Sequence, residues 1–271
     1  MKKTKFYKYQ GTGNDFILVD NRQLQLPRQN VLVYGSWCNR RFGIGADGVI
    51  LLQNCTDGDF EMAYYNADGN EGSLCGNGGR CVVAFAHHLG IIQHKTRFWA
   101  ADGWHLAAID ADSQQVELKM NNVQNITTHN NGYLLDTGSP HYVVIVPNLA
   151  QINVVEEGKK IRYSPTFAQK GVNVNFVEIH QPNRFSIATY ERGVEDETYS
   201  CGTGTVAAAI VVAMQTQHIH NNHLYAKTKG GDLQVLFEVA NNKTQNPQQA
   251  IATNIWLHGA ATRVFEGEII V

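Results

Sequence analysis

The sequence predicts a mixed α/β (α+β) chain built as two homologous domains from an internal duplication. Three observations lead to this fold class. Landmark residues recur 126 positions apart, which relates Cys75 to Cys201 and Gly45 to Gly171. Short runs rich in β-branched and aromatic residues alternate with a few apolar segments of helical length. Hydrophobic residues make up 43% of the 271 positions, enough for a sizeable buried core.

The repeat divides the chain into two halves of similar length. We expect residues 1–118 to form the half that carries Cys75, and residues 119–261 the half that carries Cys201. We also expect the C-terminal strand, residues 262–271, to return to the first half. Each half should have its own core.

Glycine turns followed by apolar runs begin both halves. Residues 11–20 read GTGNDFILVD and residues 137–146 read TGSPHYVVIV, and both predict a strand, at 16–19 and at 142–146. Residues 79–89 predict a buried helix that ends at Gly90, a residue suited to a left-handed cap. The counterpart helix is predicted at 204–217. The two cysteines thus come just before two buried helices.

Charge and cysteine content narrow the class of partner. The net charge is −2 and the basic residues are dispersed, which argues against nucleic acid or an anionic membrane as partner. The longest apolar run, residues 206–214, is too short to span a bilayer, and no signal-peptide pattern follows the N-terminus. Five cysteines without a CxxC pair suggest neither a zinc site nor a redox dithiol. We expect a cytoplasmic protein that acts on a small molecule.

A cysteine at the start of a buried helix has a chemical use. The N–H groups of a first helical turn lack partners within the helix and attract anions, and neighbouring glycines let a ligand approach the backbone. The same potential favours a thiolate. One such cysteine is more often structural, but two at equivalent positions suit the inversion of a stereocentre, with one thiol on each face.

Five stretches resemble, in order, the motifs of the diaminopimelate epimerase family. They are GTGNDF, NADGNEGSLCGNGGRC, TGSPH, GVNVNFVEI and YERGVEDETYSCGTGT, spread over nearly the whole chain. The resemblance implies an isomerase that converts LL-diaminopimelate to the meso form for lysine and peptidoglycan synthesis, with no cofactor and no metal. It also implies two domains of mostly antiparallel strands, each wrapped around a central helix, an active site in the interdomain cleft, and a homodimer.

The resemblance also implies roles for individual residues. Cys75 and Cys201 match the catalytic acid/base pair, with His141 and Glu191 as further catalytic residues. The residues that match the family's substrate-binding positions are Asn14, Asn66, Gly76, Asn77, Asn173, Glu191, Arg192, Gly202 and Thr203. Among these, Arg192 suits a carboxylate and Glu191 an ammonium group.

The chain departs from the family pattern at three positions. Ser139 stands where many members have Asn, and Gly48 where some have Gln. Phe265 stands where a Tyr contributes to the dimer contact in some members. None of the three is one of the paired cysteines.

Three alternatives share some of these features. A proline racemase or hydroxyproline epimerase has paired cysteines, but its substrate lacks the second polar end that Glu191 and Arg192 suit. A phenazine-type isomerase shares the fold without the cysteine pair. A non-catalytic amino-acid-binding protein would need the helix N-termini but neither thiol.

Overall fold

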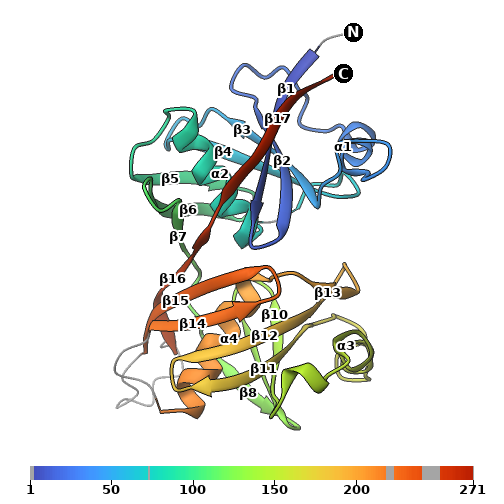
Figure 1. Cartoon of the computed structure of the whole chain (residues 1–271), viewed down its shortest axis with the longest axis vertical. Helices are drawn as coiled ribbons and strands as arrows, with labels where there is room; N and C mark the ends of the chain where they lie inside the picture. Colours follow the sequence, from blue (N-terminus) through green and yellow to red (C-terminus); the bar gives the residue numbers. More distant parts are fainter. Residues whose placement is uncertain (1–2, 73, 218–222, 240–250, 271) are drawn as a thin grey trace. The chain divides into compact units, whose positions relative to one another are not determined.

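The computed structural model describes residues 3–72, 74–217, 223–239 and 251–270. The chain forms two compact units, Met1–Leu118 together with Gly259–Val271, and Lys119–His258. In each unit, strands surround one long buried helix, α2 (Gly76–His88) in the first and α4 (Gly202–Gln215) in the second (Figure 1). The predicted strand-rich α+β fold is confirmed.

The first unit is a mostly antiparallel assembly. Its strands are β1 (Lys3–Gly11), β2 (Asn14–Asp20), β3 (Gly48–Gln53), β4 (Phe60–Asn66), β5 (Lys95–Ala100), β6 (Gly103–Asp110), β7 (Gln115–Lys119) and β17 (Thr262–Ile270). Helix α1 (Val31–Cys38) lies between β2 and β3 in the sequence. β1 pairs antiparallel with both β2 and β17. The pairs β2–β3 and β4–β5 are parallel, whereas β3–β4, β5–β6 and β6–β7 are antiparallel.

The second unit repeats this plan. Its strands are β8 (Ile126–His129), β9 (Gly132–Asp136), β10 (Pro140–Ile145), β11 (Asn173–Gln181), β12 (Arg184–Glu191), β13 (Asp196–Thr198), β14 (His223–Thr228), β15 (Gly231–Val239) and β16 (Ala252–Ala260). A short 3-10 helix (Leu149–Gln151) and α3 (Val154–Arg162) precede β11. Strands β10–β11 and β12–β14 are parallel, and β9–β10, β11–β12 and β14–β15 are antiparallel.

Strand register confirms the internal duplication. Phe16 lies opposite Gly48 in the first unit, and Tyr142 lies opposite Val174 in the second, so both members of the pair shift by 126 positions. The predicted strands at 16–19 and 142–146 fall on β2 and β10, except that β10 ends at Ile145.

The two central helices begin earlier than predicted, at Gly76 rather than residue 79 and at Gly202 rather than residue 204. Glycine is a poor helix former, but burial against the surrounding strands outweighs its propensity here. The predicted cap at Gly90 is confirmed by its φ of 72° and by its N–H bond to the His87 carbonyl at 2.9 Å. Within the described ranges, no helix has the length and apolar character needed to cross a membrane.

Candidate active site

Cys75 and Cys201 occupy the same structural position in the two units. Each is the last residue before its helix, with extended backbone (φ −95°, ψ 124° for Cys75; φ −126°, ψ 114° for Cys201). Each carbonyl accepts the first helical hydrogen bond, from Gly79 at 2.7 Å and from Thr205 at 2.9 Å. Both thiols therefore lie at the positive end of a helix dipole.

In the first unit, three of the predicted site residues lie together. The side-chain oxygen Oδ1 of Asn14 accepts hydrogen bonds from Cys75 Sγ at 3.5 Å and from Asn77 Nδ2 at 3.2 Å. Asn14 is held by a bond from its Nδ2 to Asp47 Oδ2 at 2.6 Å. Gly76, the first residue of α2, lies between Cys75 and Asn77 in the chain. The turn after β1 is thus tied to the first turn of α2.

Asp47, which holds Asn14, belongs to a charged cluster with Asp15, Arg40 and Lys8 that the sequence motifs do not predict. Arg40 Nη2 lies 2.6 Å from Asp15 Oδ1 and 2.7 Å from Asp47 Oδ1. The buried Lys8 ammonium lies 2.7 Å from Asp15 Oδ2. Burial alone would raise the pKa of Asp15, but hydrogen bonds from Arg40 and Lys8 lower it to about 2. The cluster fixes the carboxylate that holds Asn14.

Asn66 lies at the same end of the sheet as this group. It is exposed at the end of β4, in register with Gly48 of β3, the residue that follows Asp47. Among the described residues, its side chain makes no hydrogen bond to Asn14 or Cys75. A Cβ at Gly48 would come within 2.6 Å of the Tyr64 ring and 2.5 Å of the Tyr65 carbonyl oxygen, so a Gln here would displace Tyr64.

In the second unit, Cys201 reaches a buried histidine through Thr203. Cys201 Sγ lies 3.4 Å from Thr203 Oγ1, which lies 2.9 Å from His141 Nε2. Ser139 Oγ lies 3.0 Å from the same ring nitrogen. The predicted site residues Thr203 and His141 are therefore brought to Cys201, and His141 contacts the hydroxyl rather than the thiol.

His141 is held as a neutral imidazole. Burial lowers its pKa to about 3, and the charge of Arg192 lowers it further. Asn175 Nδ2 lies 3.1 Å from His141 Nδ1 and also points at the carbonyl oxygens of Tyr142 and Asn173. Nδ2 is therefore the donor, so Nδ1 accepts and Nε2 carries the proton toward Thr203 and Ser139.

Asn173, Glu191 and Arg192 lie at adjoining ends of β11 and β12. Asn173 Nδ2 donates to Ser139 Oγ and to the Pro140 carbonyl oxygen, both at 3.1 Å, while its Oδ1 accepts the Arg192 backbone N–H at 2.9 Å. The exposed Arg192 side chain donates to the Lys170 carbonyl oxygen at 3.0 Å. Within the residues the structure describes, no acidic side chain forms an ion pair with Arg192.

Sequence patterns contained signals for two of the residues that were missed. Asp47 precedes Asn173 by 126 positions, and each side chain bonds to the first residue of the neighbouring parallel strand. Asp47 Oδ2 accepts from Asn14 Nδ2 at 2.6 Å, and Asn173 Nδ2 donates to the Pro140 carbonyl oxygen at 3.1 Å. Asn175 follows Asn173 by two positions, in a strand whose first five residues are otherwise apolar, and this spacing places both amides on one face. The roles of Arg40 and Lys8 had no comparable signal.

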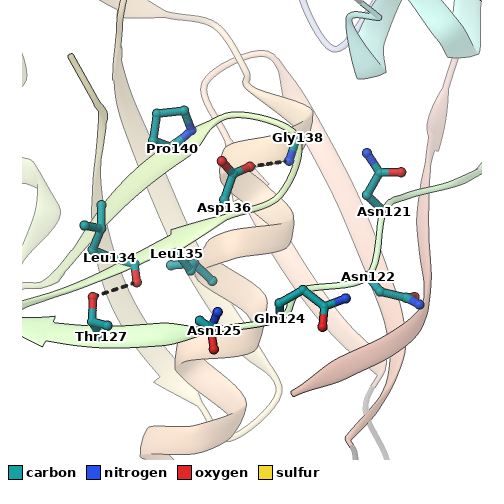
Figure 2. A pocket seen from close by; sticks show the side chains of 10 residues that line it. All are labelled: Asn121, Asn122, Gln124, Asn125, Thr127, Leu134, Leu135, Asp136, Gly138 and Pro140. Atoms are coloured by element: carbon teal, nitrogen blue, oxygen red, sulfur yellow. Dashed lines mark hydrogen bonds between the residues drawn. The ribbon is translucent and has the colours of Figure 1, made fainter. Parts of the chain in front are cut away.

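A separate hollow of about 520 Å³ lies in the second unit (Figure 2). It is lined by Asn121, Asn122, Gln124, Asn125, Thr127, Leu134, Leu135, Asp136, Gly138 and Pro140. Its wall includes the turn at Gly138, whose N–H donates to Asp136 Oδ1 at 2.8 Å. None of the predicted site residues lines this hollow.

Sequence comparisons identify relatives over the whole length. The family model described as diaminopimelate epimerase matches residues 6–126 and 133–250. The chain is 51% identical over 265 residues to the diaminopimelate epimerase of Flavobacterium psychrophilum, a match that covers 98% of this chain and 100% of that protein. It is 41% identical over 269 residues to the diaminopimelate epimerase of Chlorobaculum tepidum, covering 96% and 98%.

Solved structures share the fold at low sequence identity. A PhzF-family phenazine biosynthesis protein from Bacillus anthracis has a TM-score of 0.78 at 13% identity, and the match covers 100% of both chains. A hydroxyproline epimerase from Agrobacterium vitis has a TM-score of 0.71 at 14% identity, covering 99% of this chain and 91% of that one. These likenesses show the fold alone. The family model and the full-length relatives show more: the chain belongs to the diaminopimelate epimerase family.

Proposed function

We propose that this chain converts LL-diaminopimelate to meso-diaminopimelate without a cofactor, a step in lysine and peptidoglycan synthesis. Family membership supports the reaction. The observation that carries the mechanism is the pair of thiols, Cys75 and Cys201, each at the N-terminus of the central helix of a duplicated unit.

Cys75 and Cys201 act on opposite faces of the substrate α-carbon. A thiolate on one face removes the α-proton, and the thiol on the other face delivers a proton to the resulting carbanion. Inversion needs two such groups, because one fixed base that returned the proton would restore the starting isomer. The duplicated protein matches this two-sided requirement.

The helix N-termini bind the carboxylate next to the reacting carbon. Backbone N–H groups of Gly76 and Asn77 in one unit, and of Gly202 and Thr203 in the other, are suited to donate to it. As the α-proton leaves, negative charge spreads onto this carboxylate, so donors placed there stabilise the transition state more than the bound substrate.

The remaining polar residues bind the substrate's other groups. The Arg192 guanidinium suits a bidentate contact with a carboxylate, and Glu191 suits an ammonium group. Asn14, Asn66 and Asn173 supply amide donors and acceptors. His141 acts through Thr203: its neutral Nε2–H orients that hydroxyl beside Cys201.

The experiment that tests this proposal uses the reduced full-length protein with LL-diaminopimelate, a chelator, and no pyridoxal phosphate. We expect the meso isomer to form until the two isomers reach equilibrium. Chromatography that separates the isomers follows the reaction. Parallel incubations with L-proline and trans-4-hydroxy-L-proline test the racemase alternative. Failure to convert LL-diaminopimelate would overturn the proposal, and bound ligand recovered with unchanged configuration would favour a binding protein.

We further propose a cytoplasmic homodimer that forms through β17. The sparse, odd set of five cysteines suits a reducing compartment. β17 pairs with β1 and leaves the apolar side chains of Val264, Phe265 and Ile270 exposed. Exposed apolar side chains are one feature of association surfaces.

A further inference from the structure

Arg80 on helix α2 is a buried cation whose hydrogen bonds all go to neutral oxygens. Its side chain has no solvent exposure. It donates to Thr12 Oγ1 at 3.1 Å, to Asn77 Oδ1 at 3.0 Å and to the Gly76 carbonyl oxygen at 3.5 Å. Among the described residues, no carboxylate pairs with it and its buried Nε has no acceptor. The positive charge of Arg80 is therefore not balanced by any of its hydrogen-bond partners.

An unpaired guanidinium in the core is costly, and arginine does not lose its proton under physiological conditions. Negative charge nearby would offset that cost. Burial lowers the pKa of Arg80, whereas anionic Cys81 or Cys75 would raise it. Cys81 is an unsuitable anion, because burial strongly raises the pKa of its thiol. This leaves Cys75, one helical turn before Arg80.

The second unit has an apolar residue at the corresponding position. The position equivalent to Arg80, 126 residues later, is Val206, which is fully buried. Cys201 contacts the Thr203 hydroxyl, which in turn contacts the neutral His141. Each thiol therefore lies at the N-terminus of its own helix, but a buried cation is present one helical turn further on in α2 and absent from the equivalent position of α4.

We propose that Arg80 is a positioning residue that stabilises negative charge at the N-terminus of α2, so that Cys75 carries more thiolate than its helix position alone would give. This deepens the proposed acid/base role of Cys75 and rests on it. Arg80 also orients the amides, because it binds Asn77 Oδ1 and so turns Asn77 Nδ2 toward Asn14 Oδ1, which faces Cys75.

The other charges near Cys75 do not substitute for Arg80. Asp47 is connected to Cys75 through Asn14, and its negative charge opposes a thiolate. Arg40 is already engaged by Asp15 and Asp47, and Lys8 by Asp15. Arg80 is thus the cation without an acidic partner among the described residues around this thiol.

The test measures alkylation of the reduced full-length protein by iodoacetamide near neutral pH. The reagent is uncharged, so its approach does not depend on the charge of Arg80. Labelling rates at Cys75 and Cys201 are read from the same sample by peptide mass spectrometry, which makes Cys201 an internal reference. Turnover is not needed, so the result is independent of whether LL-diaminopimelate is the substrate.

Four variants separate charge from structure. Arg80→Met removes the charge and leaves an apolar side chain, Arg80→Gln removes it and leaves a shorter polar side chain, and Arg80→Lys keeps it. Arg22→Met removes a cation from the same unit, at a partly exposed pair with Asp20. We expect Arg80→Met and Arg80→Gln to slow labelling of Cys75 about tenfold with Cys201 unchanged. Arg80→Lys should recover most of the rate, and Arg22→Met should change neither thiol.

Two results would overturn the proposal. One is unchanged labelling of Cys75 in a folded neutral variant, with folding checked by circular dichroism. The other is an equal change at both thiols, which would indicate a general loosening of the protein. If Arg80→Met does not fold, Arg80→Gln gives the same comparison with a polar side chain in place of the guanidinium.

Discussion

Each thiol has different partners within its own unit. Cys75 faces the Asn14 amide, which is held through Asp47 by a charged cluster. Cys201 faces the Thr203 hydroxyl, which is held by the neutral His141. In both units the side chain that contacts the thiol is neutral, an amide for Cys75 and a hydroxyl for Cys201. Under the proposed mechanism, loss of either thiol removes a proton-transfer group and leaves the neighbouring polar side chains in place.

Replacing either cysteine should therefore abolish inversion while substrate binding survives. We expect Cys75→Ala and Cys201→Ala each to lower the rate by about a hundredfold or more, because a proton-transfer group is lost from a cooperating pair. Isothermal titration with meso-diaminopimelate should still show binding. Cys55→Ala, at a half-buried loop position, serves as the control and should keep the parent rate. If Cys75→Ala or Cys201→Ala keeps nearly the parent activity, the two-thiol mechanism is wrong and the cysteines are structural.

The Asp15 carboxylate should make the first unit sensitive to acid. Because the pKa of Asp15 is lowered to about 2 in the folded protein, from an ordinary value near 4, its charge stabilises the fold above about pH 4. That contribution, about 2 kcal/mol, is lost as the pH falls from about 4 to 2. Urea unfolding as a function of pH should show a shallower acid dependence in Asp15→Asn than in the parent.

Asp57→Asn, at an exposed loop position, is the matched control for the loss of one carboxylate. If stability falls with pH equally in the parent and in Asp15→Asn, the lowered pKa of Asp15 does not contribute to stability.

The charged cluster around Asp15 also shows which features of a site cannot be predicted from single residues of the sequence. Motif matching identifies Cys75, Asn14 and Asn77, but Arg40, Asp15 and Lys8 come from different elements, and no local pattern reports which charges meet.

At the scale of elements, the turn before β11 depends on Gly171. Gly171 has a φ of 74°, and a Cβ there would lie 2.6 Å from Arg192 Cδ and 2.8 Å from Arg162 Cζ. The glycine thus allows both the left-handed turn and the close passage of the Arg192 side chain. Its counterpart Gly45 has a φ of 82° and packs against Arg40 in the same way.

Gly171→Ala should damage both stability and substrate binding. The left-handed conformation alone costs about 1 kcal/mol for alanine, and displacement of Arg192 adds to it. Gly90→Ala isolates the first effect, because Gly90 has a φ of 72° but its Cβ would meet nothing within 4 Å. We expect Gly171→Ala to lose more stability in urea and to raise KM for LL-diaminopimelate, whereas Gly90→Ala keeps KM. If Gly171→Ala and Gly90→Ala have equal KM values, the position of the Arg192 side chain does not affect substrate binding.

Predictability at this scale follows the strength of the local signal. Strands β2 and β10 and the Gly90 cap are strong signals and were found. The starts of α2 and α4 were placed late, because glycine propensity argues against a helix and only tertiary burial overrides it. Helix α1 was not predicted at all: it has eight residues, contains Gly35, and has no side-chain cap and no acidic residue in its first turn.

For the whole molecule, self-association through β17 should be separable from folding. Phe265 is 47% exposed and packs edge-on against Phe6 at 6.0 Å, so its outer face is available to a second copy. We expect Phe265→Asp to shift the protein from dimer to monomer in light scattering coupled to gel filtration. Leu32→Asp, at an 87% exposed apolar position on α1, should leave the mass unchanged. A monomeric parent protein would refute the dimer.

The duplication is the whole-molecule property that the sequence predicts best. One offset of 126 relates the cysteines, the glycine turns and the strand register, and the structure repeats it in the order of parallel and antiparallel pairs. The 126-residue repeat does not predict where the two units differ. Val206 replaces Arg80 and Asn173 replaces Asp47, and these exchanges give the two thiols different surroundings on the same backbone plan.

Two separate bases on one substrate carbon have a consequence that isotopes report. In deuterated water, the thiol that donates has exchanged with solvent, while the base that abstracts carries the substrate's own proton. Product from the first turnover should therefore contain deuterium at the inverted carbon, and recovered LL-diaminopimelate should contain little. A single mobile base would instead return some of the original proton to the product. Mass spectrometry of both isomers at low conversion distinguishes the two, and undeuterated product would exclude the two-thiol mechanism even if epimerisation itself were observed.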